Sequence, residues 1–210
     1  MVKILHLVHW PKSGITTLLK QLMENINKEN FAGYVAFFIS DRDESRSFDE
    51  KCKKVFCLDN QENLISRYWA IKKIINEVKP DIIHTHSFLP GVIARFVAGK
   101  SVKSVATIHN CYPYFSNKSV RSIIKRNIEK WSIQYAKSSL ICCSQNVREC
   151  IAKVSYINNT KCIVIPNGID VRCITRGHAR RLADDEKENE SSDDIKALIF
   201  IGRLNIQKNL

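Results

Sequence analysis

Short apolar runs alternate with helical patterns along most of this chain, and that alternation constrains its fold more than any other feature. The runs of strand length cover residues 2–9, 34–40, 54–58, 81–86, 102–108, 139–143 and 163–166. Helical patterns lie between them, at residues 15–26, 64–78, 91–97, 120–135 and 145–154. Parallel neighbours need crossover connections, and these cover the sheet. The sequence therefore predicts an α/β, Rossmann-like fold, with a mainly parallel sheet and helices on both faces.

Two polar stretches interrupt this pattern. Residues 41–51 (DRDESRSFDEK) are predicted to form a surface loop between the second and third strands. A longer charged stretch, residues 172–194, ends in DDEKENESSDD and is too hydrophilic to pack, so we expect a connector there. The apolar run IKALIFIG follows it. The predicted organisation is a Rossmann-like domain at 1–171, a connector at 172–194 and the start of a second domain at 195–210.

Ligands of parallel α/β sheets bind beyond the carboxyl ends of the strands. Gly14 follows the first strand, and its missing side chain would let a phosphate or sugar approach backbone N–H groups; the alternative is a glycine that serves only the turn. His109 ends the fifth strand of the pattern, where an imidazole can donate a hydrogen bond to a substrate. The other residues predicted to line a cleft at this edge are Ser13, His86, Asn167 and Gly168.

Composition and motifs exclude several classes of protein. No apolar run approaches the roughly 20 residues of a membrane span, and the first residues lack the pattern of a signal peptide, so we expect a cytoplasmic protein. The chain has neither GxGxxG nor GxxxxGK[ST], which argues against dinucleotide oxidoreductases and P-loop enzymes. Its eight cysteines include no CxxC pair and are interpreted as reduced. The net charge of +12 favours an anionic partner.

Two histidines raise the question of a metal. His84 and His86 lie two apart in a predicted strand and therefore share a face, as a pair of metal ligands would. No third ligand is identifiable in the linear sequence, so no metal site is predicted. His84 is interpreted as a core histidine, and His86, nearer the carboxyl end of the strand, as the one that lines the cleft.

The segments IVIPNGID and FIGRLNIQKN resemble the middle of glycosyltransferase family 4, the retaining glycosyltransferases of GT-B fold. In that family the first segment closes the N-terminal domain, and the second opens the donor-binding domain. Arg203 and Lys208 match the family's spacing of five residues, which implies that they bind the donor diphosphate. Asn209 stands where a glycine often follows the lysine. The resemblance also implies that Gly14 faces the donor phosphates and that His109 contacts the transferred sugar.

The resemblance implies an enzyme that moves a hexose from a nucleotide-diphosphate sugar to a saccharide or lipid-linked acceptor, in polysaccharide or glycolipid biosynthesis. No cofactor is expected, because the nucleotide sugar is a co-substrate. GT-B enzymes need both domains, so the 210-residue chain alone is expected to be incomplete and nearly inactive. The donor sugar, the acceptor and the linkage do not follow from these residues.

Basic residues gather on the predicted helix at residues 120–135 and just before it. An apolar stripe runs along the same helix, which suits contact with an anionic membrane at its inner face; the alternative is a helix packed on the core with a solvated basic side. The residues assigned to contact with a membrane or acceptor are Lys118, Arg121, Lys125 and Arg126. A different class of function, a basic binding module for membrane or nucleic acid without catalysis, stays open, although no nucleic-acid motif is present.

Overall fold

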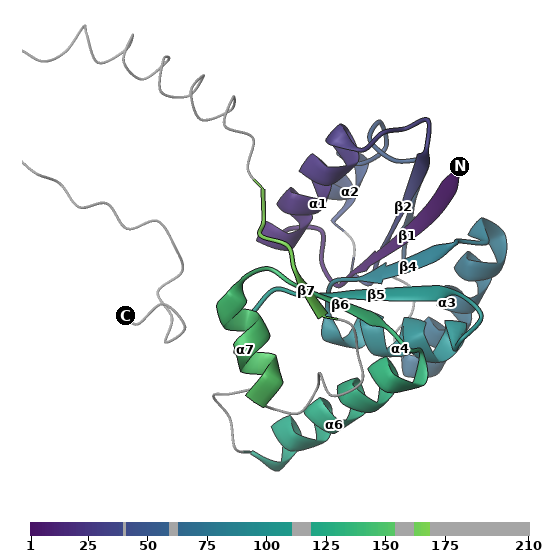
Figure 1. Ribbon diagram of the computed structural model, residues 1–210. Helices are drawn as coiled ribbons and strands as arrows, with labels where there is room; N and C mark the ends of the chain where they lie inside the picture. The colour runs from purple at the N-terminus through teal and green to yellow at the C-terminus, as the bar shows by residue number, and fades with distance from the viewer. Residues whose placement is uncertain (40, 59–62, 111–118, 154–161, 169–210) are drawn as a thin grey trace, which may run out of the picture. The chain divides into compact units, whose positions relative to one another are not determined.

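The computed structural model describes residues 1–39, 41–58, 63–110, 119–153 and 162–168, and Figure 1 shows their arrangement. The described residues form a seven-stranded sheet in the order β3-β2-β1-β4-β5-β6-β7, and every neighbouring pair is parallel. The strands are β1 (Val2–Val8), β2 (Phe31–Phe37), β3 (Lys54–Cys57), β4 (Ile82–Thr85), β5 (Lys103–Ile108), β6 (Ser139–Cys142) and β7 (Cys162–Val164). The predicted α/β, Rossmann-like fold is confirmed.

The strand order reverses between β1 and β4, because β2 and β3 extend the sheet from one side of β1 and β5, β6 and β7 extend it from β4. Loops after β1 and β4 leave toward opposite faces at such a point, and ligands of open α/β sheets bind in the crevice that opens there. The topology thus places the candidate site at the carboxyl ends of β1, β4 and β5.

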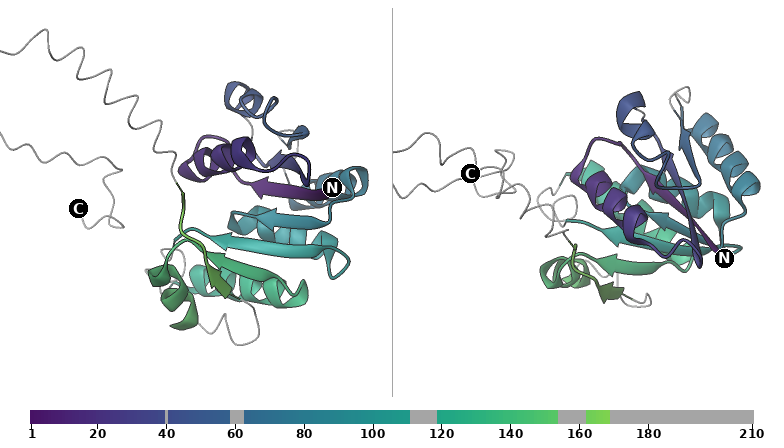
Figure 2. Two further views of the ribbon diagram at one scale, coloured as in Figure 1. Left: turned by 45° about the horizontal axis from the view of Figure 1, so that its top comes forward. Right: turned by 90° about the horizontal axis from the view of Figure 1, so that it is seen from above.

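Helices cover both faces of the sheet, as Figures 1 and 2 show. One face carries α1 (Gly14–Asn25) and the short α2 (Arg42–Arg46), and the other carries α3 (Leu64–Val78), α4 (Phe88–Ala98), α6 (Val120–Tyr135) and α7 (Gln145–Lys153). The buried apolar clusters agree with this division. Leu19 and Met23 of α1 pack with Val8, Val35 and Phe37. Leu5 and Leu7, which point to the other side of β1, pack with residues of α3 and α4.

Two predicted elements are corrected. Residues 41–51 are not simply a surface loop: α2 begins after Asp41, whose carboxylate accepts from the backbone N–H of Glu44 at 3.4 Å. Phe48 is fully buried and contacts Phe37 edge-on, so this segment closes one end of the core. The second strand covers Phe31–Phe37, three residues earlier than predicted, because its first residue pairs with Val2 at the start of β1.

The side of helix α6 that packs on the sheet is not its apolar stripe. Its buried residues are Glu129, Ser132 and Ile133. The predicted apolar stripe lies outside instead, and the members of it that are exposed are Val120, Ile124, Ile128, Trp131 and Tyr135. The helix is packed on the core, as the alternative has it, but through these three residues and not through the apolar stripe.

The described part of the chain forms one compact unit, Met1–Gly168. The predicted boundaries at 171/172 and 194/195 lie outside the described residues and stay predictions. None of the described helices is both long enough and apolar enough to cross a membrane.

Candidate functional site

A cavity of about 350 Å³ opens at the carboxyl edge of the sheet, beside the point where the strand order reverses. Its walls come from the ends of β4 and β5, from the first turn of α1, and from α4 and α6. The lining residues are Ile15, Thr85, His86, Ser87, Phe88, Arg95, Ala106, Thr107, Ile108, His109, Asn110, Lys125, Arg126 and Glu129. Of the residues predicted for a cleft or for contact with an acceptor, the cavity unites His86, His109, Lys125 and Arg126.

His109 stands directly after β5 and borders this cavity. Its backbone carbonyl lies 3.2 Å from the Cys143 thiol, which links the loop to the end of β6. Burial lowers the pKa of His109 to about 4, so the ring is neutral at physiological pH. A neutral imidazole has one N–H and one lone pair, and His109 can therefore orient a hydroxyl group or donate to an oxygen without a fixed positive charge.

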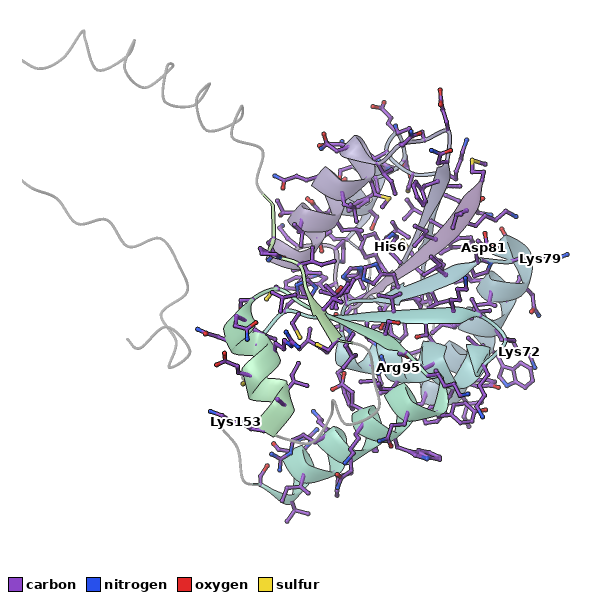
Figure 3. All side chains as sticks on the ribbon, in the orientation of Figure 1. His6, Lys72, Lys79, Asp81, Arg95 and Lys153 are labelled. Carbon is purple, nitrogen blue, oxygen red and sulfur yellow. The ribbon has the colours of Figure 1, made fainter. Side chains whose placement is uncertain are left out.

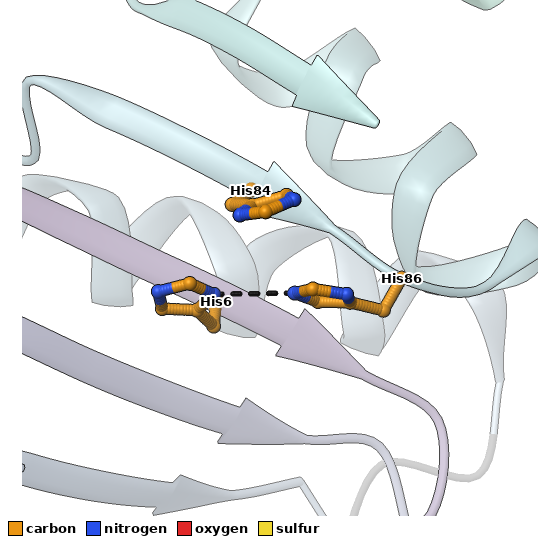
Figure 4. A group of neighbouring side chains, drawn as sticks. All are labelled: His6, His84 and His86. Atoms are coloured by element: carbon orange, nitrogen blue, oxygen red, sulfur yellow. Dashed lines mark hydrogen bonds between the residues drawn. The ribbon is translucent and has the colours of Figure 1, made fainter. Parts of the chain in front are cut away.

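Three further histidines lie close together, and Figure 4 shows His6, His84 and His86. His6 lies opposite His84 in the pairing of β1 with β4. Its Nδ1 lies 3.2 Å from Nε2 of His86, and Nδ1 of His86 lies 3.3 Å from Nε2 of His109. Nε2 of His84 lies 2.7 Å from the hydroxyl oxygen of Thr107. A row of hydrogen-bonded rings thus runs from β1 to the cavity.

Burial keeps these rings neutral as well. The pKa of His84 is lowered to about 4, by burial first and by the charge of His109 second. Burial lowers the pKa of His6 and of His86 well below the ordinary value, and the neighbouring histidines lower both further. Protonation of one ring therefore opposes protonation of the next.

The sequence reasoning missed His6: no third ligand was identifiable in the linear sequence, and the structure supplies one candidate. Ligand nitrogens of His6, His84 and His86 lie within 4.8 Å of one another, close enough to be considered for a metal. The ring geometry argues against one. The rings of His84 and His86 lie face to face at a tilt of 33°, with centroids 4.2 Å apart, whereas an imidazole binds a metal in its own plane. His84 has a hydrogen bond to Thr107, as a satisfied core histidine should.

In the loop after β1, Ser13 has a structural role that the sequence reasoning did not predict. Ser13 caps α1: its hydroxyl accepts from the backbone N–H of Thr16 at 3.3 Å and lies 2.8 Å from the Thr16 hydroxyl. A Cβ added to Gly14 would meet nothing within 4 Å, so packing does not demand glycine there. Open space at the first turn of α1 is compatible with the predicted approach of a phosphate, and the roles of Ser13 and Gly14 toward a ligand stay predictions.

The other predicted residues that the structure describes do not line this cavity. Asn167 and Gly168 are exposed after β7 and do not line it. Arg121 is exposed on α6. Lys118, Arg203 and Lys208 lie outside the described residues, so their predicted contacts stay predictions.

A buried cation that the sequence reasoning did not select also borders the cavity. Arg95 of α4 is 1% exposed, and Figure 3 shows it between α4 and α6. Its Nε donates to the Ser132 hydroxyl at 2.9 Å, its Nη1 donates to the Thr85 hydroxyl at 3.2 Å, and its Nη2 lies 3.8 Å from a carboxylate oxygen of Glu129. The one signal available in the sequence was an arginine on the otherwise apolar helix FLPGVIARFVA.

The sequence profile of Glycosyltransferase Family 4 matches residues 12–172. This chain belongs to that family. The match covers the cavity, the histidines of β4 and β5, and the basic side of α6. The predicted family is thereby confirmed, on a longer stretch than the two short segments that suggested it.

Relatives of this family 4 chain agree with the assignment. A galactosyltransferase of Escherichia coli, named UDP-Gal:alpha-D-GlcNAc-diphosphoundecaprenol alpha-1,3-galactosyltransferase, is 25% identical over 224 residues, which cover 99% of this chain and 55% of that protein. The chain thus spans about half the length of that relative.

Solved structures share the fold. Sucrose-phosphate synthase from Thermosynechococcus elongatus superposes with a TM-score of 0.62 at 14% identity, over 86% of this chain and 53% of that one. Anabaena Alr3699/HepE, in complex with UDP and glucose, superposes with a TM-score of 0.61 at 18% identity, over 87% of this chain and 50% of that one. UDP-GlcNAc 2-epimerase from Neisseria meningitidis superposes with a TM-score of 0.61 at 13% identity, over 89% of this chain and 52% of that one. At these identities the likeness shows the fold alone.

Proposed function

We propose that this chain supplies the acceptor-side half of a retaining glycosyltransferase, which moves a hexose from a nucleotide-diphosphate sugar to a lipid-linked acceptor. The observation that carries the proposal is the position of His109: a neutral imidazole at the carboxyl end of β5, on the wall of a cavity that also holds Lys125 and Arg126. Cations beside a neutral hydrogen-bonding group suit a substrate that carries both phosphate and sugar hydroxyl groups.

Each side chain has a role in this proposal. His109 hydrogen-bonds the sugar that is transferred and holds it in place for attack. Lys125 and Arg126 bind the diphosphate through which a lipid-linked acceptor is joined to its lipid, the acceptor class named for the Escherichia coli relative. Arg203 and Lys208 are assigned to the donor diphosphate. The proposal involves no metal or other cofactor.

The proposed activity is tested with the substrates of that relative as the first candidates. UDP-[14C]galactose and GlcNAc-diphosphoundecaprenol are supplied in detergent, and labelled lipid is extracted. Because the chain spans 55% of the relative, the assay is run on the chain alone and on a fusion in which the remaining part of the relative follows Leu210. Transfer that depends on both substrates supports the function, and failure to bind or use any lipid-linked acceptor overturns it.

His109→Ala tests the assigned residue. Loss of a hydrogen bond to the reacting sugar should lower kcat/KM by about 100-fold, or roughly 3 kcal/mol. His109→Asn places an amide near the position of Nδ1 and should recover part of the rate. His9→Ala, the same change at a histidine that does not line the cavity, is the matched control and should keep kcat/KM within about threefold. Equal rates for His109→Ala and wild type would remove His109 from the site.

The outer side of α3, α4 and α6 supports a second part of the proposal, contact with an anionic membrane. A groove of about 500 Å³ lies on this side, and it is lined by Leu64, Ile65, Tyr68, Phe88, Leu89, Val92, Ile93, Phe96 and Ile128. Ile65 is 72% exposed and Trp131 is 61% exposed. A contiguous, exposed apolar surface marks an interaction site.

Aromatic and basic residues flank the groove in the manner of a membrane interface. Trp131 and Tyr135 contact Phe96, with ring centroids 5.2 and 5.7 Å from it. Lys72 lies over the Trp69 ring, with Nζ 4.9 Å from its centroid. Tryptophan and tyrosine concentrate at the boundary between lipid and water, and lysine and arginine nearby attract anionic headgroups. The surface lies beside the cavity, since Phe88 lines both.

The membrane contact is tested by co-sedimentation with vesicles of phosphatidylcholine, with and without phosphatidylglycerol. Ile124→Ser with Trp131→Ser should weaken binding to the anionic vesicles by at least about tenfold, which corresponds to about 1.4 kcal/mol. Leu22→Ser with Ile39→Ser removes exposed apolar side chains elsewhere and should change little. Binding without sugar transfer would favour the alternative, a basic binding module. Equal binding to both kinds of vesicle would contradict the charge argument.

A further inference from the structure

We propose that His6 and His86 are positioning residues that hold His109 in one tautomer, with its proton on Nδ1. The inference rests on the proposed function only for the use that His109 makes of this proton. Its basis is the row of contacts from β1 to the cavity: Nδ1 of His6 to Nε2 of His86 at 3.2 Å, and Nδ1 of His86 to Nε2 of His109 at 3.3 Å.

Each contact in the row needs one N–H and one lone pair, and a neutral imidazole has one of each. The proton position on any ring therefore fixes the others. Either all three rings carry the proton on Nδ1 and donate toward the cavity, or all three carry it on Nε2 and donate away from it. A mixed row would set two protons or two lone pairs against each other.

His6, at the buried end of the row, determines whether the rings donate toward the cavity or away from it. Nε2 of His6 is buried and has no hydrogen-bond partner among the described residues. If the rings donated away from the cavity, this atom would carry an N–H without an acceptor, whereas in the other direction it carries only an unused lone pair; an unpaired buried N–H is rarer in proteins than an unpaired buried acceptor. With donation toward the cavity, every N–H inside the row has its acceptor. The proton of His109 then lies on Nδ1.

The two ring nitrogens of His109 consequently have different tasks. Its Nε2 accepts from His86, so Nδ1 is the ring nitrogen left to meet a ligand in the cavity, and it meets that ligand as a donor. A donor suits a sugar hydroxyl or a phosphate oxygen, whereas a bare lone pair would repel the latter. Neither His6 nor His86 needs to touch the substrate in this arrangement. They act through His109.

The neighbouring ring of His84 provides an internal contrast. Its ring lies 4.2 Å from that of His86, yet its Nε2 contacts Thr107 and not another histidine. His84 therefore shares the burial of the row but not its hydrogen bonds.

The test is the tautomer itself, read from two-bond 1H–15N correlations of the imidazole nitrogens in the 15N-labelled 210-residue chain at neutral pH. The signals of His86 and His109 are assigned from His86→Gln and His109→Gln. The expected spectrum shows His109 and His86 with the proton on Nδ1. A proton on Nε2 of His109, or an equal mixture, overturns the proposal without the need for any variant of His6.

His6→Asn then tests whether the far end sets the direction. Asparagine places an amide near Nδ1 of His6 that can either donate or accept, so the direction is no longer imposed and His109 should become a mixture of tautomers. The control is His84→Gln, which should leave His109 unchanged. An unchanged His109 in His6→Asn would show that His6 does not act on it.

Two further comparisons separate the possible outcomes. Spectra with and without EDTA should agree, and a difference would mean that His6, His84 and His86 hold a metal in place of the hydrogen-bonded row. No substrate is present in the measurement. The expected tautomer without sugar transfer in the assay above would therefore contradict the proposed function alone, and sugar transfer with the proton on Nε2 would contradict this inference alone.

Discussion

A single buried ion pair beside the cavity shows how individual residues hold the site. Arg95 and Glu129 are both almost completely buried, and the arginine also donates to Thr85 and Ser132. Gly91 makes room for it, because a Cβ there would lie 2.9 Å from Nη1 of Arg95. The pair connects α4 to α6 and so determines where Lys125 and Arg126 enter the cavity.

We expect Glu129→Gln to lower the free energy of unfolding by about 3 kcal/mol, because it removes a buried negative charge that lies 3.8 Å from the Arg95 guanidinium. Urea unfolding followed by circular dichroism measures the change. Glu77→Gln makes the same substitution in the exposed pair of Lys54 and Glu77 and should cost about 0.5 kcal/mol or less. Equal effects of the two variants would show that burial adds nothing to the Arg95 interaction.

At the level of the elements, the end of α3 has an unusual backbone. Lys79 follows the helix with φ 49° and ψ 62°, and its N–H donates to the carbonyl oxygen of Ile75. Pro80 comes next, and Asp81 then receives the backbone N–H of Lys3 at 2.7 Å, which joins the starts of β4 and β1. Figure 3 labels Lys79 and Asp81 at this edge of the sheet. Lys79 thus makes the turn that ends the helix, and Pro80, which cannot continue a helix, follows it.

Lys79→Gly should raise the free energy of unfolding by about 0.5–1 kcal/mol, because glycine adopts a left-handed conformation without strain. Thermal unfolding should show a higher Tm. Lys73→Gly, in the middle of α3, is the matched control and should cost about 1 kcal/mol. A Tm for Lys79→Gly as low as that of Lys73→Gly would mean that the lysine is not strained.

For the whole molecule, the neighbouring histidines His6, His84, His86 and His109 make stability depend on pH. In the unfolded chain these rings titrate near their ordinary pKa of about 6.5. In the folded protein burial lowers the pKa of His84 and His109 to about 4 and that of His6 and His86 further. Below pH 6.5 the unfolded chain therefore binds protons that the folded protein does not bind, and acid destabilises the fold.

The free energy of unfolding should consequently be constant above about pH 6.5 and fall as the pH drops toward 4, by up to about 1.4 kcal/mol per pH unit for each ring that stays neutral. Urea unfolding between pH 7.5 and 5, before most carboxylates titrate, measures the slope. His84→Gln removes one such ring and should reduce the slope by about 1.4 kcal/mol per pH unit, which corresponds to one bound proton. A flat profile over this range would show that the rings titrate normally in the folded protein.

Much of this arrangement could be predicted from the sequence because it depends on local chemistry. Alternating apolar runs and helical patterns determined the parallel sheet, and the position of His109 after a strand placed it at the edge where ligands bind. Ser144 directly precedes α7 and is a residue type that caps helices, and its hydroxyl accepts from the N–H of Val147 at 3.3 Å. These features need only neighbours in the chain.

Other features depended on contacts between distant segments, and only the tertiary structure decided them. His6 joined the histidines because β1 pairs with β4 in a register that sets His6 against His84, 78 positions apart in the numbering. The apolar stripe of α6 faces outward because the inner side of that helix must bring Glu129 and Ser132 to the buried Arg95. A sequence records which residues are present and how they alternate, whereas strand register and helix rotation follow from the packing of the whole chain.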